Sequence, residues 1–157
     1  MSVPVLVSEG ASAAQLGCLL SILLDYDKIT LFNSGMNNNT IYRDLVAWQK
    51  GVDLCELVYR ASAAFPSHEI YGLTSQIRRA AVSVPSNIAE GAGRITRGEY
   101  LQSVGYARGS LLEIETQLIV AQRLGYLDAK EIDKLMELTN EIGRVASGLV
   151  RALSRTT

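Results

Sequence analysis

A proline in the middle of a strongly helical stretch constrains the fold more than any other position in this chain. The run over residues 78–94 is rich in alanine and serine, carries Pro85 near its centre, and contains Gly91 and Gly93 at its end. Proline has no amide donor, and its ring crowds the carbonyl four residues earlier. We therefore expect the helix to bend at Pro85, to restart with Ser86 as an N-cap and to be stopped by the glycines. The small side chains predict a thin helix that a neighbour can approach closely.

Composition limits the class of protein. The chain has 157 residues, of which 48% are hydrophobic and 20% charged, and these values are typical of one globular domain. A net charge of −1 argues against a strongly basic nucleic-acid-binding protein, so nucleic-acid binding would require a local cationic patch. Neither Cys18 nor Cys55 has a histidine or a second cysteine at metal-ligand spacing, and we interpret both as buried thiols in a reducing cytoplasm.

The first forty residues differ from the rest. The apolar stretch over residues 16–24 is far shorter than the ~20 residues that a membrane span requires, so we expect no membrane association and a cytoplasmic protein. The polar segment over residues 33–40 has the composition of a linker. We predict an N-terminal extension over residues 1–40, with Met36 as an alternative start site, and a second unit over residues 41–157.

Four helical blocks follow this extension. The first covers about residues 41–64, because apolar side chains recur three and four positions apart, and Pro66 ends it. The second begins near Leu73 or Thr74 and continues through the bend at Pro85.

Capping signatures mark the starts of the third and fourth helices. Thr96-x-x-Glu99 opens one and Asp128-x-x-Glu131 opens the other. The third helix ends before Gly125, a position that favours a left-handed residue. Helices of this length are roughly 33–42 Å long, and their short connections require antiparallel neighbours. The predicted fold is all-α, an antiparallel, up-down four-helix bundle with a Pro-kinked second helix.

Six motifs, in order, resemble those of a known family. They are Tyr42-Arg43-Asp44-Leu45-x-Ala47-Trp48-Gln49-Lys50, Phe65-Pro66-x-x-Glu69-x-Tyr71-Gly72-Leu73, Gln76-Ile77-Arg78-Arg79-Ala80-Ala81, Pro85-Ser86-Asn87-Ile88-Ala89-Glu90-Gly91, Gly109-Ser110-Leu111-x-Glu113 and Leu124-Gly125-Tyr126-Leu127. Together they resemble the small bacterial family called four-helix bundle proteins. That family includes the proteins encoded in intervening sequences of 23S ribosomal RNA genes and the accessory variability determinants of diversity-generating retroelements. The resemblance covers about residues 41–153.

The resemblance implies a protein without enzymatic activity. Family members form oligomeric bundles, in known cases five-fold rings with a central channel, so it implies a homo-oligomer and specifically a pentamer. The accessory members bind a reverse transcriptase and nucleic acid through basic surface residues. The candidate partners are therefore RNA or DNA and a reverse transcriptase, with no cofactor. The fold alone does not determine which of these partners applies.

A local excess of arginine supplies candidate contacts for nucleic acid. Five arginines outnumber two glutamates between residues 76 and 109, which gives a local charge of +3. The five are Arg78, Arg79, Arg94, Arg97 and Arg108. Contacts of this kind hold phosphates and position a nucleic acid without reading its sequence. The alternative is that these arginines pair with Glu90, Glu99 or Glu113, or lie on a solvated helix face.

A polar stripe follows the proline. Asn87, Glu90 and Arg94 are spaced three and then four residues apart, so they share one face of the helix. We expect this stripe to hydrogen-bond carbonyls released at Pro85 or to contact a neighbouring subunit, and ligand binding is the alternative.

Two glycines lie inside the third helix. Gly105 and Gly109 each cost ~1 kcal/mol relative to alanine at a helical position. This cost predicts close contact with the small-residue face of the second helix, and a ligand pocket is the alternative. The chain also offers tyrosines that could stack on bases, among them Tyr59 and Tyr106, although aromatic side chains on bundle helices more often belong to a core or an interface.

The residues do not supply a recognisable catalytic, metal or cofactor site. Glu113 and Glu115 are two apart and point in different directions, and the sole histidine, His68, is in a connection outside any Glu-x-x-His motif. The Gly-Ala-Gly segment before Arg94 lacks the third glycine of a dinucleotide-binding fingerprint. Three hypotheses follow: an oligomeric scaffold that binds nucleic acid, a protein–protein adaptor without nucleic-acid binding, and, with no support from these residues, an enzyme with a cryptic site.

Overall fold

The computed structural model describes residues 42–155, and the predictions made for residues 1–40 lie outside this range. Four α-helices and two 3₁₀ turns make up the described chain. In chain order they are η1 (Tyr42–Asp44), α3 (Val46–Ser62), η2 (Ser67–Tyr71), α4 (Leu73–Ala92), α5 (Arg97–Arg123) and α6 (Ala129–Arg155).

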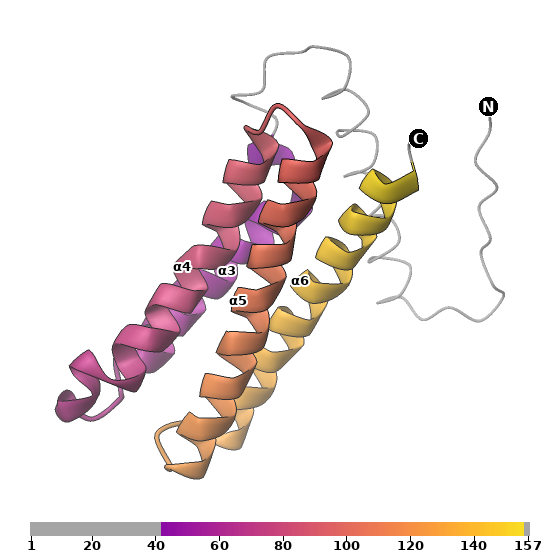
Figure 1. Cartoon of the computed structure of the whole chain (residues 1–157). Helices are drawn as coiled ribbons and strands as arrows, with labels where there is room; N and C mark the ends of the chain where they lie inside the picture. Colours follow the sequence, from indigo (N-terminus) through magenta and orange to yellow (C-terminus); the bar gives the residue numbers. More distant parts are fainter. Residues whose placement is uncertain (1–41, 156–157) are drawn as a thin grey trace, which may run out of the picture.

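Successive helices run in opposite directions (Figure 1). Each helix packs on the next one in the chain, and α6 closes the arrangement by packing on α3. An ion pair joins these first and last helices, with 3.0 Å between Lys50 Nζ and Glu141 Oε1. The predicted all-α, up-down four-helix bundle is confirmed.

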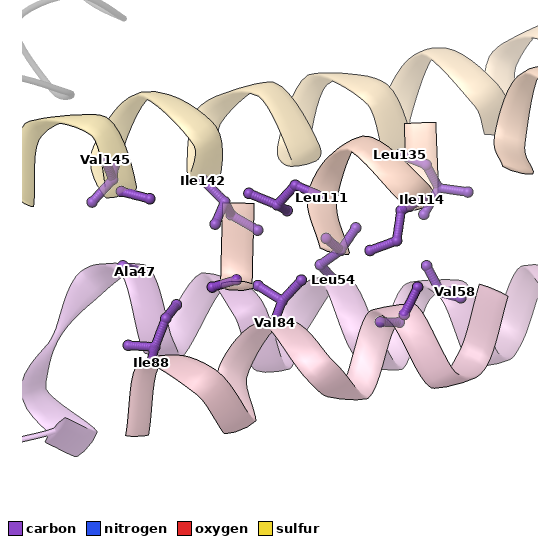
Figure 2. Close-up of a cluster of buried hydrophobic side chains, with 14 of the residues drawn as sticks. Ala47, Leu54, Val58, Val84, Ile88, Leu111, Ile114, Leu135, Ile142 and Val145 are labelled. Carbon is purple, nitrogen blue, oxygen red and sulfur yellow. The ribbon is translucent and has the colours of Figure 1, made fainter. Parts of the chain in front are cut away.

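The core consists of aliphatic side chains from all four helices. Figure 2 shows Leu54, Val84, Ile114 and Ile142, one from each helix, pointing into the space between them. All four are completely or almost completely buried. Helical periodicity therefore places one apolar stripe of each helix in a single common core.

Helix α3 begins later than the periodicity predicts. Instead of one helix from residue 41, the chain makes the short turn η1, and Leu45 then takes an extended backbone conformation with φ −69° and ψ 124°. The side chain of Leu45 is 1% exposed, so the interruption directs this leucine into the core. An apolar residue at helical spacing can therefore be buried without being helical, if the backbone changes direction and points its side chain into the core.

Helix α4 does not restart at Pro85. It is assigned as one helix from Leu73 to Ala92 with the proline inside, and the prediction that Ser86 is an N-cap is wrong. The Ser86 hydroxyl instead donates to the carbonyl of Val82 at 2.8 Å. Pro85 is buried against α3 at Gly51, where an added Cβ would lie 3.3 Å from Pro85 Cβ. Tertiary packing thus holds the proline within the helix.

The predicted capping boxes are both confirmed. The Thr96 hydroxyl accepts from the backbone N–H of Glu99 while the Glu99 carboxylate accepts from the backbone of Thr96. The backbone N–H of Glu131 donates to the carboxylate of Asp128 at 2.8 Å, and the reciprocal bond is 3.3 Å long. Gly125 follows α5 with φ +74°, the predicted left-handed conformation.

Close helix contact occurs at different glycines from those predicted. Gly105 and Gly109 are exposed, and a Cβ added at either would meet nothing within 4 Å, so the contact predicted for them within the bundle is wrong. The close approach is at Gly91, which is buried inside α4 rather than terminating it. A Cβ there would lie 2.6 Å from Cδ2 of Tyr100 and 2.9 Å from Cβ of Ser103, both on α5.

Alanine substitutions separate two kinds of glycine. Gly125→Ala is expected to lower the free energy of unfolding by about 1 kcal/mol, because φ of +74° is strained for an L-residue. Gly105→Ala is expected to raise it by about 1 kcal/mol, since this exposed helical position has room for a methyl group. Urea denaturation followed by circular dichroism measures both. A loss of stability in Gly105→Ala would contradict the open surroundings of that position.

Candidate nucleic-acid interface

Arg78 is anchored to α3 by uncharged partners. Its Nε donates a hydrogen bond to the hydroxyl of Ser62 at 2.8 Å. Its guanidinium carbon lies 4.9 Å from the centre of the Tyr59 ring, a cation–π arrangement. The side chain is half-buried, and these contacts hold the guanidinium at the boundary between α3 and α4.

Arg79, the next residue, is exposed and also has an uncharged partner. Its Nη2 donates to Oε1 of Gln76 at 2.6 Å. Within the described residues, neither Arg78 nor Arg79 forms an ion pair with a carboxylate. Arg60, in contrast, is neutralised by Glu56 at 2.6 Å. Two adjacent positive charges are therefore left without a compensating charge on this surface.

A shallow groove opens beside these two arginines. It has a volume of about 440 Å³. Side chains from α3, η2 and α4 line it: Tyr59, Ile70, Thr74, Ser75, Arg78, Arg79 and Val82. The groove thus combines two cations with hydroxyl groups, an aromatic ring and aliphatic surface.

The other three predicted arginines lie elsewhere. Arg94 follows Arg79 by fifteen positions of mostly helical chain, a distance on the order of 20 Å. Arg97 is the first residue of α5, and Arg108 is exposed further along the same helix. The structure brings Arg78 and Arg79 to one groove and does not gather all five arginines there.

Arg94 has acidic neighbours at its end of the bundle. It forms an ion pair with Glu90, one helical turn earlier, as the alternative interpretation predicted. The pKa of the nearby Glu99 carboxyl is lowered, first by the hydrogen bond from the Thr96 hydroxyl, then by the Thr96 backbone N–H, and further by the positive charge of Arg94. The positive charge of Arg94 is thus partly neutralised by Glu90 and Glu99.

Asn87 is hydrogen-bonded within its own helix, to a serine that in turn contacts α5. Its Nδ2 donates to both the carbonyl and the hydroxyl oxygen of Ser83, each at 2.8 Å. The Ser110 hydroxyl of α5 donates to the same Ser83 hydroxyl at 2.8 Å. The residues just before and after Pro85 are therefore held in a small polar network between α4 and α5.

Sequence reasoning missed most of the groove. The sequence indicates that Tyr59 could stack on bases, but it does not indicate that Tyr59 lies beside Arg78. Ile70, Thr74 and Val82 come from two elements that the chain brings together around the connection between α3 and α4. One sequence signal could have indicated that Tyr59 and Arg78 are neighbours: they lie on two consecutive helices, on either side of the short connection that contains η2.

Few groups in the described part of the chain suit catalysis. No group of three or more His, Cys, Asp or Glu side chains gathers there as a metal site, and none of the described helices is long and apolar enough to cross a membrane. Cys55 is a free, half-buried thiol whose pKa is raised by burial. His68 is exposed in η2, as predicted.

The described chain is a small all-helical bundle that carries two adjacent arginines beside a shallow surface groove. The model of the 23S rRNA-intervening sequence protein family matches residues 43–148, which is most of the chain. The chain belongs to this family, as the motifs quoted above predicted. No curated protein is detectably similar to it in sequence.

Proposed function

We propose that this protein is a non-enzymatic, homo-oligomeric scaffold that binds RNA or DNA through Arg78 and Arg79. The observation that carries the proposal is the pair of adjacent guanidinium groups at an open groove, held by uncharged partners only. Guanidinium groups bind phosphate oxygens in a bidentate geometry, and such contacts supply most of the affinity for a nucleic acid. Although the chain is slightly acidic overall, it would bind nucleic acid through this local pair of arginines.

The family description suggests the first partners to test. Its name connects relatives with 23S ribosomal RNA genes. We therefore propose a cytoplasmic protein that associates with ribosomal RNA, with the DNA that encodes it, or with a reverse transcriptase of a retroelement. The adaptor hypothesis, in which the protein binds only another protein, is the alternative outcome.

The outward face of α5 supports assembly into a homo-oligomer. Leu112 is 63% exposed, and Ile119 and Val120 are each 41% exposed. With Gly105 and Gly109 they fall on one side of the helix, away from the core. A second copy packed there would cover this apolar surface, and a five-fold ring is the arrangement that the resemblance implies.

The double substitution Arg78→Ala with Arg79→Ala tests the nucleic-acid part of the proposal. We expect binding of labelled RNA to weaken at least about tenfold, and the dependence of log Kd on log salt to fall by about 1–2, because two phosphate contacts are lost. Fluorescence anisotropy over a series of salt concentrations measures both quantities.

Matched variants locate the contact. Arg123→Ala with Arg144→Ala removes the same charge from two exposed positions away from the groove and should change binding little. Replacing Arg94, Arg97 and Arg108 together tests the three predicted arginines that lie outside the groove. If the wild-type protein binds neither RNA nor DNA at low salt yet retains a stable protein partner, the adaptor function holds instead. Light scattering that finds only a monomer would contradict the oligomeric scaffold.

A further inference from the structure

We infer that the groove between α3 and α4 takes a single-stranded segment of nucleic acid, with an unpaired base against the apolar lining and the phosphates on the two arginines. This inference rests on the proposed function and specifies the kind of nucleic acid.

The apolar part of the lining is unusually open to solvent. Tyr59 is 44% exposed, Ile70 is 58% exposed and Val82 is 42% exposed. They come from α3, η2 and α4, yet they surround one hollow of about 440 Å³. That volume lies within the range of sites for small organic groups such as a nucleobase. Burying a base there would remove water from three apolar side chains at once.

A stacking platform lies within the same groove. The guanidinium carbon of Arg78 lies over the ring of Tyr59, 4.9 Å from its centre, so a cation and an aromatic ring are already in contact here. Bases of single strands stack on aromatic rings and on arginine planes in proteins that bind them. An unpaired base can extend this stack, whereas the bases of a duplex already stack on one another and are closed to it.

Charge complementarity favours a phosphate-bearing occupant. The Ser62 hydroxyl accepts a hydrogen bond from Nε of Arg78, and Oε1 of Gln76 accepts one from Nη2 of Arg79. The other guanidinium nitrogens remain available for a phosphate. No carboxylate in the described part of the chain neutralises either side chain. The acidic side chains of a peptide would match the charge but carry no planar ring for the stack. A nucleotide brings the ring and the anion in one unit.

The test compares single-stranded and duplex RNA of the same sequence. The probes are a short fluorescein-labelled RNA without internal pairing and its blunt duplex, each titrated with the full chain. We expect the single strand to bind about tenfold more tightly. Tyr59→Ala should weaken single-strand binding about tenfold and leave duplex binding unchanged, because it removes the stack and keeps both arginines.

Two further variants make the comparison specific. Tyr106→Ala removes a tyrosine that is 58% exposed on α5, away from the groove, and should leave both affinities unchanged. Val82→Ser alters the groove from α4 and should reproduce part of the effect of Tyr59→Ala. If Tyr59→Ala does not fold, as judged by circular dichroism, Val82→Ser with Ile70→Ser carries the test.

The outcomes separate this inference from the function on which it rests. Equal affinities for single strand and duplex, both lost in the Arg78 and Arg79 variants, would overturn the inference and leave nucleic-acid binding intact. Failure of the wild-type protein to bind any nucleic acid would overturn the proposed function itself. Displacement of the RNA by polyglutamate, with polyglutamate binding reduced equally by Tyr59→Ala, would assign the groove to an acidic protein partner instead.

Discussion

Replacing Leu111 by alanine is expected to lower the free energy of unfolding by about 3 kcal/mol. Leu111 lies on the buried face of α5 and is 3% exposed, and Figure 2 shows it among the side chains of the bundle interior. The truncation loses the transfer free energy of the removed methyl groups. It also leaves a cavity that long, mutually packed helices can close only in part.

Leu112→Ala is the matched control, because it makes the same chemical change one residue further along. Leu112 is 63% exposed, so its truncation should change the free energy of unfolding by no more than about 0.5 kcal/mol. Urea denaturation at low protein concentration, followed by circular dichroism, compares the two variants. Equal losses would mean that α5 does not present these two leucines to different environments, and would contradict the packing described above.

The contrast between these adjacent leucines shows what the sequence predicts well. Helical spacing predicts one apolar stripe that includes Leu111, Ala107, Ile114 and Leu118, and all four are buried. This succeeds because 3.6 residues per turn is a property of the backbone, so any apolar residue in phase with the others faces the same core. Capping boxes are predictable for the same reason, since donor and acceptor are three residues apart in one chain.

Predictions failed where a neighbouring helix decides the outcome. Pro85 remains inside α4 because α3 presents Gly51 beside it, which no local pattern reveals. Gly105 and Gly91 look alike as glycines in helices, yet only Gly91 faces another helix closely. The glycine itself does not indicate which face of the helix it occupies; only its phase does, and Gly91 is in phase with the buried residues Val84 and Ile88.

The arginines show the corresponding limit for the candidate site. A charge count along the sequence groups Arg79 with Arg94, but Arg79 lies in the first half of α4 and Arg94 lies beyond its C-terminal end, on the order of 20 Å further along the chain. The groove instead combines Arg79 with Tyr59 and Ile70, which belong to elements before α4. Residues close in sequence form a patch only when the fold brings their side chains together, and Arg94 does not line this groove.

Replacing Gly91 by valine is expected to lower the free energy of unfolding by about 3 kcal/mol. The first added atom would lie 2.6 Å from Cδ2 of Tyr100, whose side chain is buried and only 2% exposed. It would also lie 2.9 Å from Cβ of Ser103, which moves only with the backbone of α5. Helices α4 and α5 must therefore separate at this end of the bundle, and the packing beside them is lost.

Gly93→Val provides the control, because it places the same side chain two residues later. Gly93 is exposed, has a φ of −88° that L-residues adopt freely, and an added Cβ there would approach only backbone oxygens, the nearer at 3.4 Å. Its effect should stay within about 0.5 kcal/mol. Thermal and urea denaturation followed by circular dichroism compare the two. If both variants were equally stable, the contact at Gly91 would not be close in solution; a large loss confined to Gly91→Val would establish that this glycine sets the separation of α4 and α5.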